Sequence, residues 1–169
     1  MSPSDEEFRA ELRSWLTEHA PPAVEIASTE GDAETLREWQ RTLHAGQWVG
    51  IHWPTEYGGR AASMTQVAIY NEELARANAP GVLGRAGITL VGPTLMAHGT
   101  EEQRRRLLPR ILAGDDVWCQ LFSEPDAGSD LASLSTRAEQ HGDVYRVTGQ
   151  KVWSSYATFA EAKAAAAQG

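Results

Sequence analysis

The sequence has a single cysteine, Cys119, and fewer basic than acidic residues. One cysteine excludes an intrachain disulfide and a metal cluster held by several cysteines. The 15 lysines and arginines stand against 23 aspartates and glutamates, which gives a formal net charge of −8. This charge argues against a nucleic-acid-binding protein, because such proteins need a positive field to attract phosphate.

Long apolar runs are missing as well. No run approaches the roughly 20 residues that a membrane-spanning helix requires. The N-terminal sequence MSPSDEEF is acidic, where a signal peptide would be basic and then apolar. We therefore expect a cytoplasmic protein with no membrane span. Its 169 residues, 41% hydrophobic and 22% charged, suit one large globular domain or two small ones.

The short motifs of several enzyme classes are also absent. The sequence contains no G-x-G-x-x-G, no G-x-x-x-x-G-K-[ST], no H-E-x-x-H and no G-x-S-x-G. Its histidines are scattered without the spacing of metal ligands, so no metal site is expected. They are His19, His44, His52, His98 and His141.

The first two-thirds of the sequence has the apolar spacing of amphipathic helices. Ser4 with Glu7, Ser63 with Gln66, and Thr100 with Gln103 each have the spacing of a capping box at a helix start. Proline or glycine then ends or interrupts several of these segments. The expected helices cover residues 4–20, 33–47, 63–78, 87–98 (interrupted at Gly92-Pro93) and 100–113, and residues 50–59 form a loop.

After Asp116 the pattern changes to short runs of strand-forming residues, which predict strands at 117–122, 135–139 and 144–153. Helices first and strands second indicate an α+β fold. We expect an N-terminal all-α helical domain at residues 1–115 and a partial antiparallel β-domain at residues 116–169. Because three strands leave edges unpaired and cannot close a barrel, the chain is expected to be truncated or completed by partners.

The segment F-S-E-P-D-A-G-S-D at residues 122–130 places proline, glycine, serines and aspartates directly after a strand. From the residues alone, a polar β-turn is the simplest interpretation. Such a turn also exposes backbone N–H groups and hydroxyls that can bind a ligand. Both interpretations stay open at this point.

Four segments resemble motifs of the acyl-CoA dehydrogenase family. The sequence from Gln120 to Asp130 resembles the family signature T/S-E-P-x-A-G-S-D, and G-Q-K-V-W-S-S at 149–155 is similar to a second family motif. W-P-T-E-Y-G-G at 53–59 and H-G-T-E-E-Q at 98–103 precede them in the family's order and approximate spacing. The resemblance implies an N-terminal helical domain, a middle β-domain and a C-terminal four-helix domain, of which this sequence holds the first and part of the second.

The resemblance further implies FAD as the cofactor. The backbone around Phe122 and Ser123 would bind the pyrimidine edge of the flavin, and Trp153 would pack near the ring. Ser129 would also contact the acyl-CoA substrate. The residues implied to line the cofactor are Gln120, Leu121, Phe122, Ser123, Glu124, Pro125, Asp126, Ala127, Gly128, Ser129, Trp153, Ser154 and Ser155.

The family reaction is removal of an α-proton from an acyl-CoA thioester and hydride transfer to the flavin, which gives a 2-enoyl-CoA. By resemblance the catalytic base comes from the C-terminal helical domain, beyond Gly169, and Glu124 matches a loop position with a structural role. We therefore expect no catalytic residue here and no activity of this chain alone. An electron-transfer flavoprotein as electron acceptor and tetrameric full-length relatives are implied as well.

Two alternatives remain open. The chain could be a non-catalytic assembly module that pairs with a full-length homologue. It could also belong to an acyl-CoA oxidase or flavin monooxygenase built on the same scaffold. The arginine-rich run at residues 104–110 could attract CoA phosphates, although such a run is more often a solvated helix face.

Overall fold

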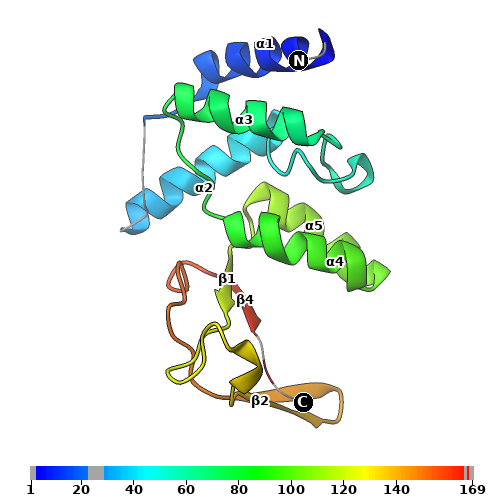
Figure 1. Cartoon of the computed structure of the whole chain (residues 1–169), viewed down its shortest axis with the longest axis vertical. Helices are drawn as coiled ribbons and strands as arrows, with labels where there is room; N and C mark the ends of the chain where they lie inside the picture. Colours follow the sequence, from blue (N-terminus) through cyan, green and yellow to red (C-terminus); the bar gives the residue numbers. More distant parts are fainter. Residues whose placement is uncertain (1–2, 23–28, 166, 168–169) are drawn as a thin grey trace. The chain divides into compact units, whose positions relative to one another are not determined.

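The computed structural model describes residues 3–22, 29–165 and 167. The chain divides into two compact units, a helical unit (Met1–Val117) and a strand unit (Trp118–Gly169). Helices followed by strands confirm the α+β class (Figure 1). The helical unit contains α1 (Pro3–His19), α2 (Glu30–Ala45), α3 (Met64–Arg76), α4 (Gly92–His98) and α5 (Glu101–Ala113), with a 3-10 turn η1 (Thr55–Tyr57) and a π-helical segment η2 (Gly87–Val91).

Two of the three predicted capping boxes form. The side chains of Ser63 and Thr100 accept a hydrogen bond from the backbone N–H three residues later. In return, the side chains of Gln66 and Gln103 accept from the backbone N–H of Ser63 and Thr100. The prediction for Ser4 was wrong, because α1 already begins at Pro3 and Ser4 lies inside it. Helix α2 begins at Glu30, earlier than predicted, since Thr29 forms a capping box with Asp32 instead of the usual glutamate or glutamine.

The helical core is joined by a buried amide, Gln40. Its Nε2 donates to the carbonyl oxygens of Ile111 at 2.8 Å and Leu112 at 3.3 Å, and its Oε1 accepts from the Gly84 N–H at 2.9 Å. The amide thus ties α2 to the end of α5 and to the segment before η2, inside a core of aliphatic and aromatic side chains. The buried side chains of this core include Leu12, Leu36, Trp39, Leu43, Trp48, Val49, Ile51, Leu83, Leu108, Ile111 and Leu112.

The position of Trp53 explains why residues 59 and 92 are glycines, and it bears on how α4 begins. Its indole Nε1 donates to the Ile88 carbonyl at 3.0 Å. A Cβ at Gly92 would collide with the indole ring, and one at Gly59 would collide with the Trp53 carbonyl. The predicted interruption at Gly92-Pro93 is a change from π-helical to α-helical winding, with the proline in the first turn of α4, where its missing N–H costs nothing.

An ion cluster joins α1 to α3, which lie side by side in Figure 1. The carboxylate of Glu73, 1% exposed, accepts from Arg9 Nη1 at 2.7 Å and from Arg13 Nε and Nη2 at 2.8 Å. Hydrogen bonds, first from Arg13 and then from Arg9, outweigh the opposing effect of burial and lower the pKa of Glu73 from 4.5 to about 2. Glu73 is therefore charged at neutral pH.

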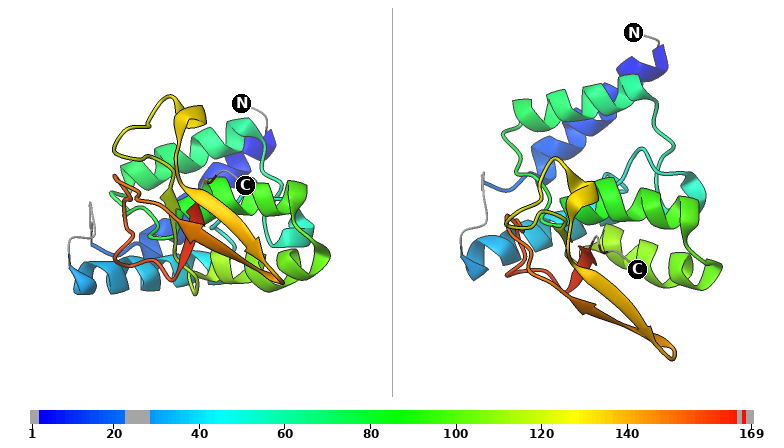
Figure 2. Two further views of the ribbon diagram at one scale, coloured as in Figure 1. Left: turned by 90° about the horizontal axis from the view of Figure 1, so that it is seen from below. Right: turned by 60° about the horizontal axis from the view of Figure 1, so that its bottom comes forward.

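The strand unit holds two separate pairs of strands. β1 (Trp118–Leu121) pairs in parallel with β4 (Ala162–Ala165), and β2 (Arg137–His141) pairs with β3 (Val144–Thr148) as an antiparallel hairpin, seen as a two-stranded ribbon in Figure 2. A 3-10 turn, η3 (Leu131–Ser133), precedes β2. The residues of β3 are all exposed, including Val144, Tyr145 and Val147.

The predicted strand at 144–153 was wrong after Thr148. Residues 149–153 do not continue the pairing with β2, because the backbone N–H of Val152 and the Nζ of Lys151 donate to carbonyl oxygens of the loop that follows β1. Trp153 and Tyr156 then have φ angles of 56° and 62°, which no extended strand contains. β4 was not predicted, because its alanine-rich sequence has helical rather than strand propensity and only pairing with β1 makes it extended.

Two absences hold for the described part of the chain. None of its helices has the length and apolar character needed to cross a bilayer. It also contains no group of three or more histidine, cysteine, aspartate or glutamate side chains that could hold a metal ion.

Gln40→Leu should destabilise the helical unit, because it leaves the Gly84 N–H and the Ile111 and Leu112 carbonyls buried without their side-chain partner. We expect the free energy of unfolding in urea to fall by about 2–4 kcal/mol. Glu38→Ala, an exposed change on the same helix, should alter it by less than about 0.5 kcal/mol. Equal effects of the two substitutions would contradict the role given to Gln40.

Glu73→Gln tests the ion cluster through pH. Because the folded pKa of Glu73 is depressed, its contribution to stability is present above the unfolded pKa and is lost as the pH falls toward about 2. The wild type should therefore be more stable than Glu73→Gln at pH 7, and the gap should narrow from about pH 5 downward. Urea unfolding at a series of pH values measures this gap, and a gap independent of pH would refute the assignment.

Candidate functional site

The polar loop after β1 is built around a tight turn. The backbone N–H of Glu124 donates to the Ala127 carbonyl at 2.7 Å, and the N–H of Ala127 donates back to the Glu124 carbonyl at 3.3 Å. Pro125 occupies the first of the two central positions, where its fixed φ favours a turn. The β-turn interpretation of this segment is therefore correct for residues 124–127.

The Glu124 carboxylate anchors this turn from inside the strand unit. It accepts from the Ser135 N–H and hydroxyl, both at 2.7 Å, from the Thr136 N–H at 2.9 Å, and from Lys151 Nζ at 2.8 Å. These hydrogen bonds, first that from Lys151 and then those from Thr136 and Ser135, hold the pKa of Glu124 well below its ordinary range. The group is a fully engaged carboxylate, and it has no free lone pair to take a proton from a substrate.

Lys151 brings the second motif segment against the first. Besides the Glu124 carboxylate, its Nζ donates to the Phe122 carbonyl at 3.0 Å, and the next residue, Val152, donates its N–H to the Ser123 carbonyl at 2.9 Å. The backbone just before Trp153 therefore runs directly beside Phe122 and Ser123. Residues about 30 positions apart in the sequence thus form one surface.

The sequence alone assigns no role to Lys151, although the residue lies in the G-Q-K-V-W-S-S segment at 149–155. A signal for it existed. Glu124 follows an apolar strand and needs a cation or hydrogen-bond donors if it is buried, and Lys151 is the one cation in the G-Q-K-V-W-S-S segment. The glycine that opens this motif also has a structural reason, because a Cβ at Gly149 would collide with the Thr136 hydroxyl.

The predicted site residues differ in their accessibility. Glu124 and Ala127 are buried in the turn, and Leu121, Phe122, Ser123 and Ser154 are partly exposed. Trp153 is 89% exposed and has a left-handed backbone, a strained conformation for a bulky residue. The others are exposed, namely Gln120, Pro125, Asp126, Gly128, Ser129 and Ser155.

This surface carries donors of the kind that the pyrimidine edge of a flavin would need. Among the described residues, the N–H groups of Phe122 and Ser123 and the hydroxyls of Ser123 and Ser129 have no hydrogen-bond partner. Nothing lies within 4 Å of a Cβ built at Gly128, so the loop is open on that side. Ring carbonyls and nitrogens need donors of this kind, and the ion pair with Lys151 neutralises the Glu124 carboxylate.

The arginine run on α5 is largely engaged in local contacts. Arg110 binds both oxygens of Asp116 at 2.7 Å, Arg104 donates to the Leu95 carbonyl at 3.2 Å, and Arg105 lies 3.8 Å from Glu101. These contacts favour a solvated helix face over a site for CoA phosphates.

Comparisons with known proteins agree with this architecture. A family model described as acyl-CoA dehydrogenase, N-terminal domain, matches residues 2–115. Acyl-CoA dehydrogenase IpdE1 of Mycobacterium tuberculosis is 45% identical over 161 residues, which cover 90% of this chain and 41% of that protein. The ChsE4-ChsE5 complex from Mycobacterium tuberculosis matches with a TM-score of 0.81 at 38% identity, over 99% of this chain and 42% of the other. The Tcur3481-Tcur3483 steroid ACAD matches with a TM-score of 0.82 at 36% identity, over 99% and 44%.

A helical unit followed by a strand unit is an α+β arrangement, and the solved relatives share it. More particularly, the chain belongs to the acyl-CoA dehydrogenase family, whose members are FAD-dependent oxidoreductases. It spans less than half the length of the relatives just described.

Lys151→Met should loosen the turn, because Glu124 then keeps a buried charge without its cation. We expect the pKa of Glu124 to rise and the amide protons of Ser135 and Thr136 to exchange about tenfold faster or more. Hydrogen exchange followed by NMR measures both amides. Arg146→Met, which removes an exposed cation on β3, is the matched control, and an equal change in the two variants would contradict the account.

Proposed function

We propose that this chain forms one wall of the flavin site in an FAD-dependent acyl-CoA dehydrogenase. The enzyme would oxidise the Cα–Cβ bond of an acyl-CoA thioester to give a 2-enoyl-CoA. The observation that carries the proposal is the Glu124–Lys151 ion pair, because it holds the two motif segments side by side. The donors of Phe122 and Ser123 are left without a partner among the residues that the structure describes.

The donors and the indole ring of this surface have separate roles in the proposal. The N–H groups of Phe122 and Ser123 and the Ser123 hydroxyl donate to the pyrimidine edge of the flavin, and Trp153 packs against the ring, with Ser154 and Ser155 beside it. Donors at that edge stabilise negative charge on the ring, as an oxyanion hole does. FAD, when bound, supplies the acceptor for the hydride. Ser129 would contact the thioester end of the substrate.

Glu124 is not the base in this proposal. A base must accept the α-proton, and the Glu124 carboxylate is already saturated by Ser135, Thr136 and Lys151 and has a depressed pKa. We assign the proton abstraction to a carboxylate outside residues 1–169, so this chain alone should not dehydrogenate an acyl-CoA.

The remaining features of the whole enzyme are inferred from its relatives. The similarity to a steroid ACAD favours a bulky, steroid-derived acyl group as the substrate class. The similarity to the ChsE4-ChsE5 complex favours assembly with a second acyl-CoA dehydrogenase chain. An electron-transfer flavoprotein is the proposed electron acceptor.

Flavin binding by the 169-residue chain tests the proposal. Titration of FAD with the protein should quench or shift the flavin fluorescence, and Ser123→Ala should weaken binding by roughly 2- to 10-fold, the worth of one hydrogen bond. Ser14→Ala, an exposed serine on α1, serves as the control and should bind like the wild type.

The outcomes are distinct. Binding that weakens only in Ser123→Ala supports the flavin wall. No binding by protein with a folded circular-dichroism spectrum, together with copurification of a homologue, would refute it and favour the assembly module.

A further inference from the structure

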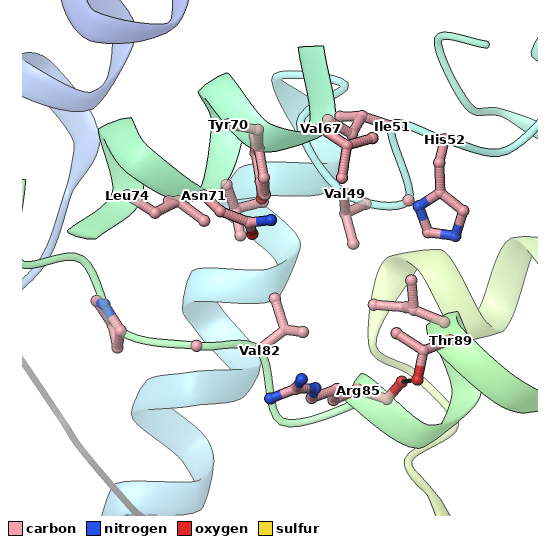
Figure 3. A pocket seen from close by; sticks show the side chains of 15 residues that line it. Val49, Ile51, His52, Val67, Tyr70, Asn71, Leu74, Val82, Arg85 and Thr89 are labelled. Atoms are coloured by element: carbon pink, nitrogen blue, oxygen red, sulfur yellow. Dashed lines mark hydrogen bonds between the residues drawn. The ribbon is translucent and has the colours of Figure 1, made fainter. Parts of the chain in front are cut away.

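The helical unit contains a pocket that has no role in the proposed flavin wall. It lies between α3, residues 80–82 and the start of η2, with the loop at 49–52 along one side (Figure 3). Its volume is about 350 Å³, within the range of roughly 300–1,000 Å³ typical of small-molecule sites. Every residue that lines it belongs to the helical unit.

The interior of the pocket is apolar. Figure 3 shows Val67 and Leu74 projecting from α3, with Val49 and Val82 on the facing segments. Val49 and Ile88 are buried in the core behind them, so this wall is held in place by the packing of the helical unit. Leu43, Ile51 and Pro80 complete the apolar lining. A compact hydrocarbon body would replace water on these side chains.

Four polar side chains line this pocket without a partner among the residues that the structure describes, and three of them, His52, Asn71 and Arg85, are exposed to solvent. His52, Tyr70, Asn71 and Arg85 line the pocket. None of their side chains makes a hydrogen bond or an ion pair with any residue that the structure describes. A mostly apolar pocket with a few convergent, unused polar groups is the usual form of a small-molecule site.

The charge of the pocket comes from Arg85. Burial lowers the pKa of His52, so that ring is neutral at pH 7. No aspartate or glutamate is among the described lining residues. The two glutamates of α3 next to the pocket, Glu72 and Glu73, are bound to arginines of α1 instead. Arg85, which is exposed to solvent, therefore lines the pocket as a cation that has no ion pair with any residue that the structure describes.

The wall that carries Arg85 and Thr89 is itself unusual. It runs into the π-helical segment η2, where the Trp53 indole binds the Ile88 carbonyl. Single π-helical turns are rare and are found frequently at functional sites. Here the wider winding is fixed from behind by Trp53 and carries Ile88 and Thr89, which line the pocket.

We propose that this pocket binds a small carboxylate with a compact apolar body, with the carboxylate on Arg85 and the body against Val49, Val82 and Ile88. The planar guanidinium of Arg85 matches a carboxylate with two parallel hydrogen bonds. Asn71 and Tyr70 are further polar groups for an oxygen of the ligand. The site requires neither the strand unit nor FAD, so it stands or falls independently of the proposed function.

Calorimetry on the 169-residue chain without FAD tests this site with two matched probes. They are 1-adamantanecarboxylate and the neutral 1-adamantanemethanol, which have the same apolar body. The carboxylate should bind about tenfold more tightly or better, the worth of a charge-assisted hydrogen-bond pair. Arg85→Gln should remove that difference, whereas Arg106→Gln, an exposed arginine on α5, should preserve it.

Thr89→Phe provides a second variant, because its exposed position tolerates a larger side chain that would fill the pocket. It should weaken both probes, and circular dichroism checks that each variant is folded. The proposal is overturned if the two probes bind equally, if Arg85→Gln and Arg106→Gln behave alike, or if neither probe binds the folded protein at about millimolar concentration.

Discussion

The strand unit depends on the charge of Glu124. This carboxylate is buried, and a buried charge is tolerated only where it is paired and hydrogen-bonded. The donors come from two distant places, Ser135 and Thr136 before β2 and Lys151 after β3. A single carboxylate therefore fixes the turn after β1, the entry to β2 and the segment that leads to Trp153. The donors of Phe122 and Ser123 remain available for a ligand because the turn is held from the other side.

The helical unit follows the same principle with different groups. The amide nitrogen of Gln40, on α2, donates to the end of α5, and its oxygen accepts from the segment before η2. The carboxylate of Glu73, on α3, accepts from two arginines of α1. Apolar burial supplies most of the driving force for folding, but it does not fix how helices are aligned. These buried polar groups fix the alignment, because each of them finds its partners in one arrangement of the helices only. Arg85 has no such partner in the described part of the chain, which sets it apart from the arginines that hold the helices together.

Local signals in the sequence predicted the helices and missed the long-range contacts. Ser63 and Thr100 were recognised as helix starts because a capping box lies within four residues. Thr29 was missed because aspartate takes the place of the usual glutamate. The ends of the strands could not be predicted, since Lys151 leaves β3 for a carboxylate 27 positions earlier. β4 exists only through its pairing with β1. For the site, the resemblance supplied the loop residues, whereas the ion pair that holds them together required the folded structure.

The central claim is that Phe122, Ser123 and Ser129 form a flavin-contacting surface with Trp153. Chemical-shift mapping by two-dimensional NMR, with FMN added to the isotope-labelled chain, tests it residue by residue. The account predicts that the largest shifts fall on the amides of residues 120–129 and 153–155 and on the indole N–H of Trp153. Shifts confined to the helical unit, or spread evenly over the chain, would contradict it.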